Sequence, residues 1–150
     1  MMDELDLKIL RVLQENSSLT VTEIAKRVGL SASPCWKRIN RLENDGVIKY
    51  QSAVLDSKKL GVNLTVFMSI RTGEHSGEWL DNFAKFIKKM PEVQEFHRMA
   101  GEIDYLLKIV VPDMDHFDKF YKNMVETIPL KDVTSSFSME TIKQTTALPI

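Results

Sequence analysis

The segment SASPCWKRINRLENDG, Ser31–Gly46, has the pattern of a short helix with two different faces. One set of side chains recurs at the spacing of a packed helical stripe: Cys35, Ile39 and Leu42. A second, polar set falls on the opposite face: Ser33, Lys37, Asn40, Arg41 and Asn44. Ser31 and Ser33 are alternative N-caps, Pro34 suits only a first turn, and Gly46 provides a stop. The segment therefore predicts a helix to about Asn44 that packs on one side and is exposed on the other.

The residues around this segment predict two more helices and a small strand. An apolar stripe indicates a helix over residues 3–14, formed by Leu5, Ile9, Val12 and Leu13. Thr20 and Glu23 form a capping-box pattern before a second short helix, which Gly29 ends. The stretch VIKYQSAVL, Val47–Leu55, is β-branched and roughly alternating, which predicts a strand or wing. Three short helices and a wing are typical of a helix-turn-helix domain.

The polar face of the Ser31–Asn44 helix has the chemistry of a DNA-reading surface. The chain has a net charge of −1 and a pI near 6.3, so any nucleic-acid contact must be confined to a patch. Ser31–Leu42 carries three cations and no acid, and Lys, Arg and Asn side chains can pair with base edges in the major groove. The candidate DNA-binding residues are Thr20, Ser31, Ser33, Pro34, Trp36, Lys37, Arg38, Asn40 and Arg41. A solvated helix also exposes Lys and Arg, but the complete helix-turn-helix pattern favours double-stranded DNA as the partner.

The second half of the chain has the periodicity of an antiparallel sheet with helices. Residues 62–70 alternate apolar and polar, and residues 93–99, 103–111 and 133–142 have similar strand-like composition. Amphipathic helices are predicted between the first pair and the last pair of strands, around Trp79–Met90 and Phe117–Ile128. The order βαββαβ predicts a ferredoxin-like domain and an α+β fold class. We therefore divide the chain into a DNA-binding domain at residues 1–50, a linker strand and hinge at 51–61, and a second domain at 62–150.

The composition argues against several other classes of protein. A single cysteine cannot form an internal disulfide, and His75, His97 and His116 lack the spacing of metal ligands. No stretch has the length of apolar residues that a membrane span needs, so we expect a cytoplasmic protein with no membrane partner. The second domain offers no nucleophile and base in a catalytic pattern, so an enzyme on this fold is the least favoured function, and no catalytic or metal residue is assigned.

A glycine turn in the second domain is a candidate ligand site. Gly101 lies beside Glu102 and Asp104, where backbone N–H groups could bind a carboxylate and an acidic side chain could bind an ammonium group. A plain β-turn with solvated acids is the simpler interpretation of the residues alone.

Long stretches of the chain resemble one family. Residues 1–55, which contain LDLKILRVLQENSSLTVTEIAKRVGLSASPCWKRINRLENDGVIKY, closely resemble the N-terminal domain of the Lrp/AsnC (leucine-responsive, feast/famine) regulators. GEIDYLLKIVVPDM, Gly101–Met114, and the ending TTALPI are similar to the effector-binding (RAM/ACT-like) domain of that family. The resemblance implies a bacterial or archaeal, nucleoid-associated regulator that binds an amino acid at a contact between subunits.

The same resemblance implies a set of effector-binding residues. They are Gly101, Glu102, Asp104, Tyr105, Met114, Thr134, Ser136, Phe137 and Ser138. The apolar neighbours Met99, Met114 and Phe137 would suit a leucine or methionine side chain, and no other cofactor is expected. With both helices on one face, the sheet would leave apolar residues such as Phe67, Leu106 and Val110 uncovered on the other face, which predicts a two-fold dimer that packs sheet on sheet. The resemblance implies that such dimers assemble further, to an octamer.

The function expected from these observations is sequence-specific transcriptional regulation, with DNA affinity or assembly controlled by the amino acid. An architectural DNA-binding protein with little effector control is the alternative. Effector-dependent changes in the DNA footprint or in oligomer size would distinguish the two.

Overall fold

The structure is a computed structural model that describes residues 2–74 and 76–150. The described residues form two compact units, each with its own hydrophobic core. The first contains the residues up to Val54 together with residues 142–150, and the second contains residues 55–141. The predicted α+β class is confirmed.

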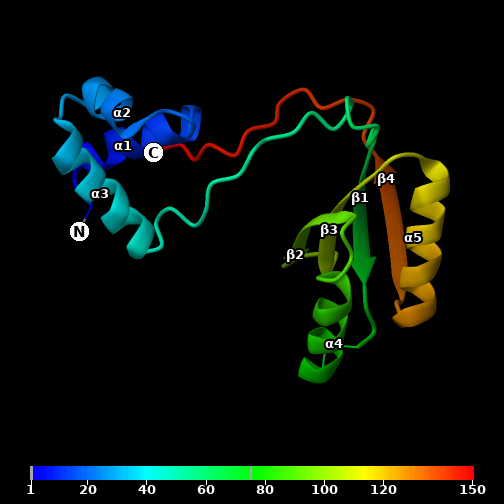
Figure 1. Cartoon of the computed structure of the whole chain (residues 1–150). Coiled ribbons are helices and arrows are strands. Elements are labelled where there is room, and N and C mark those ends of the chain that lie inside the picture. The colour runs from blue at the N-terminus through cyan, green and yellow to red at the C-terminus, as the bar shows by residue number, and fades with distance from the viewer. Residues whose placement is uncertain (1, 75) are drawn as a thin grey trace. The chain divides into compact units, whose positions relative to one another are not determined.

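The first unit contains the three predicted helices (Figure 1). They are α1 (Glu4–Glu15), α2 (Val21–Val28) and α3 (Ala32–Asn44). The Thr20 hydroxyl accepts a hydrogen bond from the Glu23 N–H, and the Glu23 side chain accepts one from the Thr20 N–H, which completes the expected capping box. Gly29 ends α2 with a φ of 75°, a conformation that glycine adopts without steric cost.

One apolar stripe from each helix forms the core of this unit. The buried residues are Ile9, Leu10, Ile24, Ala25, Val28, Cys35, Ile39 and Leu42. The three α3 residues predicted to pack are therefore the ones that are buried, and they fix which side of the helix is exposed.

The strand or wing predicted for residues 47–55 is not formed in the part of the chain that the structure describes. After α3, the N–H groups of Val47 and Ile48 both donate to the carbonyl of Leu42, and the chain then continues without regular structure. Tyr50 and Val54 are 78% and 87% exposed, so the alternating side chains meet no second layer. A strand needs a neighbouring strand to bond its backbone groups, and this segment has none within its unit.

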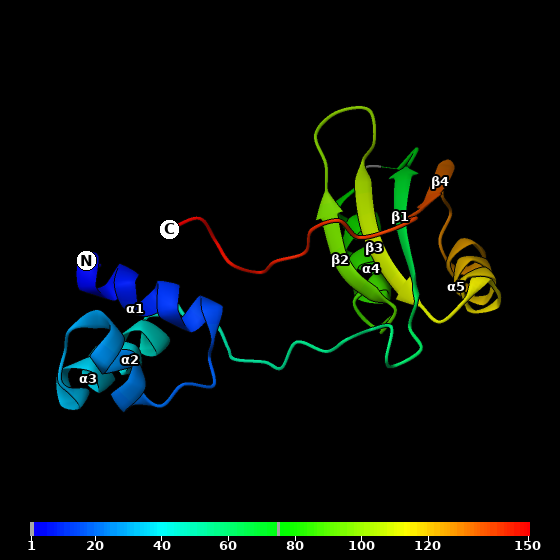
Figure 2. The same ribbon diagram turned by 90° about the horizontal axis from the view of Figure 1, so that it is seen from above.

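The second unit is a four-stranded antiparallel sheet with two helices. The strands are β1 (Leu64–Arg71), β2 (Val93–Arg98), β3 (Tyr105–Val111) and β4 (Asp132–Phe137). The helices α4 (Gly77–Ile87) and α5 (Met114–Thr127) connect β1 to β2 and β3 to β4. The spatial order β2-β3-β1-β4 can be followed from left to right in Figure 2. This is the predicted βαββαβ arrangement.

One face of the sheet packs against both helices. Alternate residues of β1, Val66, Met68 and Ile70, are fully buried. They share a core with Leu107 of β3, Phe83 of α4 and Phe120 and Met124 of α5. Asp113 caps α5 by accepting a hydrogen bond from the His116 N–H.

The end of the chain differs from the sequence-based expectation. The last strand was predicted to reach residue 142, but it ends at Phe137, beyond which the Ser138 N–H donates to the carbonyl of Thr65 (2.9 Å). Residues 142–150, which we assigned to the second domain, make their contacts with the first unit in this structure. The Gln14 side chain on α1 accepts a hydrogen bond from the Leu148 N–H (2.6 Å) and donates one to the Leu148 carbonyl (3.2 Å). These two bonds hold the end of the chain against the first unit.

Candidate functional site

The exposed side of α3 carries most of the predicted DNA-binding residues. Ser31, Ser33, Pro34 and Lys37 are exposed, Trp36 is 53% exposed, and Asn40 is half-buried at the rim. Lys37 has no ion-pair partner among the residues that the structure describes. The turn before α3 is held by a bond from the Leu30 N–H to the Ala25 carbonyl (2.8 Å). The arrangement presents a rigid helix whose outward groups can donate and accept hydrogen bonds.

Two hydroxyl groups next to this surface have different roles. Thr20, predicted to contact DNA, uses its hydroxyl in the capping box of α2. Ser31 occupies the N-cap position of α3, but its side chain makes no capping hydrogen bond, contrary to the expectation that a serine cap would close this end. The first N–H groups of α3 and the Ser31 hydroxyl thus remain available to an outside acceptor.

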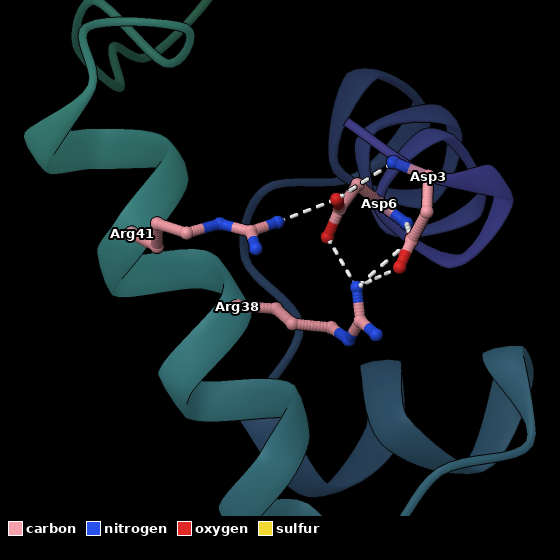
Figure 3. Close-up of polar contacts among 4 residues, drawn as sticks. All are labelled: Asp3, Asp6, Arg38 and Arg41. Atoms are coloured by element: carbon pink, nitrogen blue, oxygen red, sulfur yellow. Dashed lines mark hydrogen bonds and ion pairs between the residues drawn. The ribbon is translucent and has the colours of Figure 1, made fainter. Parts of the chain in front are cut away.

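The two arginines of α3 are held by α1 (Figure 3). Arg38 Nη1 lies 2.7 Å from Asp6 Oδ1 and 2.8 Å from both carboxylate oxygens of Asp3. Arg41 Nη2 donates to Asp6 Oδ2. Asp6 is completely buried, whereas the side chains of Arg38 and Arg41 are 25% and 45% exposed. The predicted basic patch on α3 is therefore partly neutralised from within the same unit.

The hydrogen bonds keep the cluster ionised. Burial acts to raise the pKa of the Asp6 carboxyl, but the Asp3 N–H and the two arginines outweigh it, so that pKa lies below its ordinary value. The pKa of Asp3 is lowered by the Asp6 N–H and by Arg38. The pKa of the Arg38 guanidinium is raised by hydrogen bonds to Asp6 and then Asp3.

Sequence reasoning did not identify Asp6 as part of this surface. The signal was present, because Asp6 lies three and four residues before the buried Ile9 and Leu10 and therefore on the packed side of α1. An acid at such a position needs a partner, and Arg38 and Arg41 are the cations three residues apart on a neighbouring helix.

The predicted effector-binding residues lie in three places in the second unit. Gly101 lies in the β2–β3 connection with a φ of 141°, which favours glycine. In the same connection, Arg71 Nε donates to the Glu102 carbonyl (2.7 Å), and the Asp104 carboxylate accepts from the Thr72 N–H (2.7 Å). Asp104, one of the two acids considered as partners for an ammonium group, already has a backbone partner here.

The remaining predicted residues lie elsewhere on the sheet. Met114 begins α5, next to the end of β3 that pairs with the start of β1. Phe137 packs edge-on against Phe117, with ring centroids 5.2 Å apart, and Ser138 bonds Thr65 at that same end. Because Asp104 bonds Ile70 at the opposite end of β1, one chain does not bring the two groups together.

Three residues of the set have contrasting environments. Tyr105 is buried among the aromatic rings of Trp79, Phe83 and Phe96 in the core. Thr134 and Ser136 are exposed on β4, at the level of Ser69 and Phe67 of β1. Tyr105 is therefore a packing residue in a single chain, while the two hydroxyl groups face away from the helices.

The face of the sheet opposite the helices carries apolar side chains. Phe67 is 40% exposed between Lys108 of β3 and Ser136 of β4, and Leu106 and Val110 are partly exposed on the same face. Lys108 is neutralised by Glu95 on β2, at 3.1 Å. This face, which we call the open face, combines an apolar centre with internally paired charges.

Neither a metal site nor a membrane span is found within residues 2–74 and 76–150. No three His, Cys, Asp or Glu side chains there could hold a metal ion, and no helix is long and apolar enough to cross a bilayer. His97 and His116 contact Glu95 and Asp113, while His75 lies outside the described residues.

Comparison with known proteins identifies both units. Residues 2–49 match a model of winged helix-turn-helix DNA-binding domains, and residues 65–148 match the Lrp/AsnC ligand-binding domain. The chain is 49% identical to the transcriptional activator DecR of Escherichia coli over 151 aligned positions, covering 100% of this chain and 99% of that one.

Two solved structures extend the likeness to the whole fold. An AsnC-family transcriptional regulator from Agrobacterium tumefaciens is 55% identical with a TM-score of 0.96, covering 99% of this chain and 97% of that one. A transcriptional regulator from Neisseria meningitidis, in complex with L-methionine, is 36% identical with a TM-score of 0.94 at the same coverage. The chain described here belongs to the Lrp/AsnC family of transcriptional regulators.

Proposed function

We propose that this regulator binds specific DNA sequences through the exposed side of α3 and responds to a small amino acid, with leucine or methionine as the best candidates. The observation that carries the DNA-binding part is the division of α3 into a fully packed stripe and an exposed polar side. Because Cys35, Ile39 and Leu42 lock the helix in the core, its outward groups are held in place before DNA arrives.

The exposed side chains suit different parts of a DNA duplex. Asn40 can pair with adenine, Lys37 with guanine or a phosphate, and Ser33 with either. The uncapped N-terminus of α3 and the Ser31 hydroxyl suit a backbone phosphate, with Thr20, Pro34 and Trp36 at the margins of the contact. Each good base contact contributes ~1–3 kcal/mol of discrimination.

Selection from duplexes with a randomised centre tests this assignment. The unaltered chain is expected to enrich one sequence, and Asn40→Ala to relax the preference at one base pair. Lys37→Gln is expected to weaken binding and to lower the salt slope by about 1, since it removes one cation. Lys8→Gln on the exposed side of α1 makes the same change in charge and serves as the control. Equal effects of the two lysine variants would contradict the assignment.

The open face supports pairing of two chains. A two-fold dimer that covers Phe67, Leu106 and Val110 would remove exposed apolar surface and present two α3 helices to two half-sites. Phe67→Glu is expected to reduce the mass measured by light scattering, whereas Val125→Glu, on the exposed side of α5, is not. An unchanged mass for Phe67→Glu would rule out this interface. Assembly of such dimers to an octamer is the further expectation.

The effector site is proposed to be completed by a second chain. Met114, Phe137 and Ser138 lie at the end of the sheet opposite Asp104, while Thr134 lies on β4 beside Ser69. A compact site that includes all of them therefore needs the Gly101–Asp104 turn of one subunit beside the Met114 and Phe137–Ser138 region of another. Support for an amino acid comes from the ligand-binding domain model and from the relative whose structure contains L-methionine. The hydroxyl groups of Thr134 and Ser136 are free to bind a zwitterion's charged groups.

Thermal unfolding with each amino acid tests the effector. L-Methionine or L-leucine is expected to raise the midpoint, and D-methionine is not. Thr134→Val removes a hydroxyl at constant shape and is expected to abolish the shift, while Thr141→Val, which is also exposed, preserves it. If no amino acid shifts the midpoint or changes the DNA footprint, the architectural alternative is favoured.

A further inference from the structure

The N-terminal unit contains a charged group that the proposed DNA contact does not use. Asp6 is the single charged side chain that is buried within residues 2–74 and 76–150. It lies on α1, yet it contacts two residues of α3. We infer that Asp6 is a positioning residue that sets how selectively α3 binds DNA, by holding Arg38 and Arg41 away from general contact with phosphates; this inference rests on the proposed function.

Both arginines are bound by the carboxylate of Asp6. The two oxygens of Asp6 are each used by a different guanidinium, and Asp6 Oδ2 also accepts the Asp3 N–H at 3.0 Å. Arg38 Nη1 bridges Asp6 and Asp3, so its charge faces two carboxylates (Figure 3). Charge-assisted bonds to a carboxylate that is shielded from water are stronger than the same bonds at the surface.

The charge balance makes this restraint consequential. Residues 1–50 carry eight Lys and Arg against seven Asp and Glu, a net charge of plus one. Without the carboxylate of Asp6, the net charge would be plus two, and the freed cation would lie on the helix proposed to enter the groove. General affinity for DNA depends on how many cations reach phosphates, whereas specificity depends on base contacts. Keeping the two arginines bound to Asp6 therefore lowers the general affinity for DNA without reducing the specificity.

Asp6 differs from its neighbour Asp3 in two ways. The Asp3 side chain is 52% exposed and contacts only Arg38 of the two arginines, whereas Asp6 is buried and contacts both. Asp6 also closes the capping box at the start of α1, so the same carboxylate links the first turn of α1 to α3. Asp6 is thus the centre of the restraint and Asp3 an auxiliary.

The test compares Asp6→Asn with Glu4→Gln in the full-length chain. Both variants remove one acid from α1, but Glu4 pairs with Arg11 on the same helix and not with α3. The probes are the duplex that the unaltered chain selects from a randomised pool and a scrambled duplex of equal composition. At moderate salt, the Asp6→Asn variant is expected to bind the scrambled duplex ~10-fold more tightly than the unaltered chain does. The slope of log affinity against log salt concentration is expected to be steeper by about 1 for each α3 that contacts DNA. The ratio of selected to scrambled affinity is expected to fall.

A purely structural role of Asp6 predicts the opposite sign. Loss of helix packing would weaken binding to both duplexes, whereas release of arginines strengthens binding to the scrambled one. If Asp6→Asn matches Glu4→Gln in slope and ratio, or weakens both affinities, the inference is wrong. In an Arg41→Gln background, Asp6→Asn has less charge to release, and its effect on the scrambled duplex is expected to shrink.

Asp3→Asn provides a milder variant if Asp6→Asn does not fold. Asparagine caps a helix about as well as aspartate, so α1 keeps its N-cap while Arg38 loses one of its two charged partners. The same direction of change is expected, with a smaller amplitude, and no change relative to Glu4→Gln would overturn the inference. If the unaltered chain selects no sequence, the proposed function itself fails; if it selects one and the variants behave alike, only the role of Asp6 fails.

Discussion

The two units stabilise their helices in different ways. In the second unit, α4 and α5 lie on a sheet, and the large side chains of both helices share one core with residues from all four strands. In the first unit, three short helices share a smaller apolar core, and a buried carboxylate joins α1 to α3. A helix proposed to enter a groove can bury only one side, so its orientation depends on one packed stripe and on a few strong contacts at its edge.

The largest effect is expected from removing an aromatic ring in the second unit. Phe83 is fully buried, with Trp79, Phe96 and Tyr105 around it. Phe83→Ala is expected to lower the free energy of unfolding by ~3–5 kcal/mol, because removal of the ring loses buried apolar surface and leaves a cavity. Urea unfolding in a Trp36→Phe background measures this, since Trp79 is then the one tryptophan in the chain. A loss below ~1 kcal/mol would show that this core is loosely packed.

The buried carboxylate of the first unit predicts a pH dependence. The pKa of Asp6 in the folded protein lies below its unfolded value, so its contribution is complete above about pH 4 and is lost as the pH falls through the folded pKa. Asp6→Asn is expected to cost ~1–3 kcal/mol near neutral pH, since a neutral amide with one acceptor oxygen replaces the buried carboxylate that Arg38 and Arg41 share. Its unfolding midpoint should also fall less than that of the unaltered chain on acidification.

Thermal unfolding between neutral and acidic pH, followed in a Trp79→Phe background, checks this difference through Trp36 on α3. Glu4→Gln is the control, because its partner Arg11 and the carboxylate itself are exposed. If the unfolding midpoints of Asp6→Asn and of the unaltered chain fall in parallel with pH, the buried carboxylate does not cause the acid sensitivity.

These two regions also mark what could be predicted from sequence. Periodicity identified the buried stripes of α3 and β1, because local spacing alone decides which side chains share a face. The contact from Asp6 to Arg38 joins residues far apart in the chain, and the separation of Asp104 from Met114 depends on strand register. The segment around Tyr50 and Val54 has strand-like composition but no partner, so local pattern alone predicted a strand that the single chain does not form.

The apolar contacts of the first unit predict a smaller effect at its cysteine. Cys35 is completely buried, and burial raises the pKa of its thiol. Cys35→Ser is expected to cost ~1–2 kcal/mol by placing an unpaired hydroxyl in the core. Alkylation of the unaltered chain by iodoacetamide should be slow until urea unfolds it. Fast reaction in the native state would mean that α3 opens more readily than its packed stripe implies.

The smallest effect is expected where the second unit has an ion pair of its own. Lys122 and Asp118 pair four residues apart on α5, with side chains 65% and 56% exposed. The contact resembles that between Arg41 and Asp6, but here both groups are solvated. An exposed ion pair adds little to the free energy of unfolding, because each group is also well hydrated when it is unpaired. Asp118→Asn should leave the thermal midpoint unchanged within error at low and high salt. A shift as large as that of Asp6→Asn would show that burial of the carboxylate is not what distinguishes the α1–α3 contact.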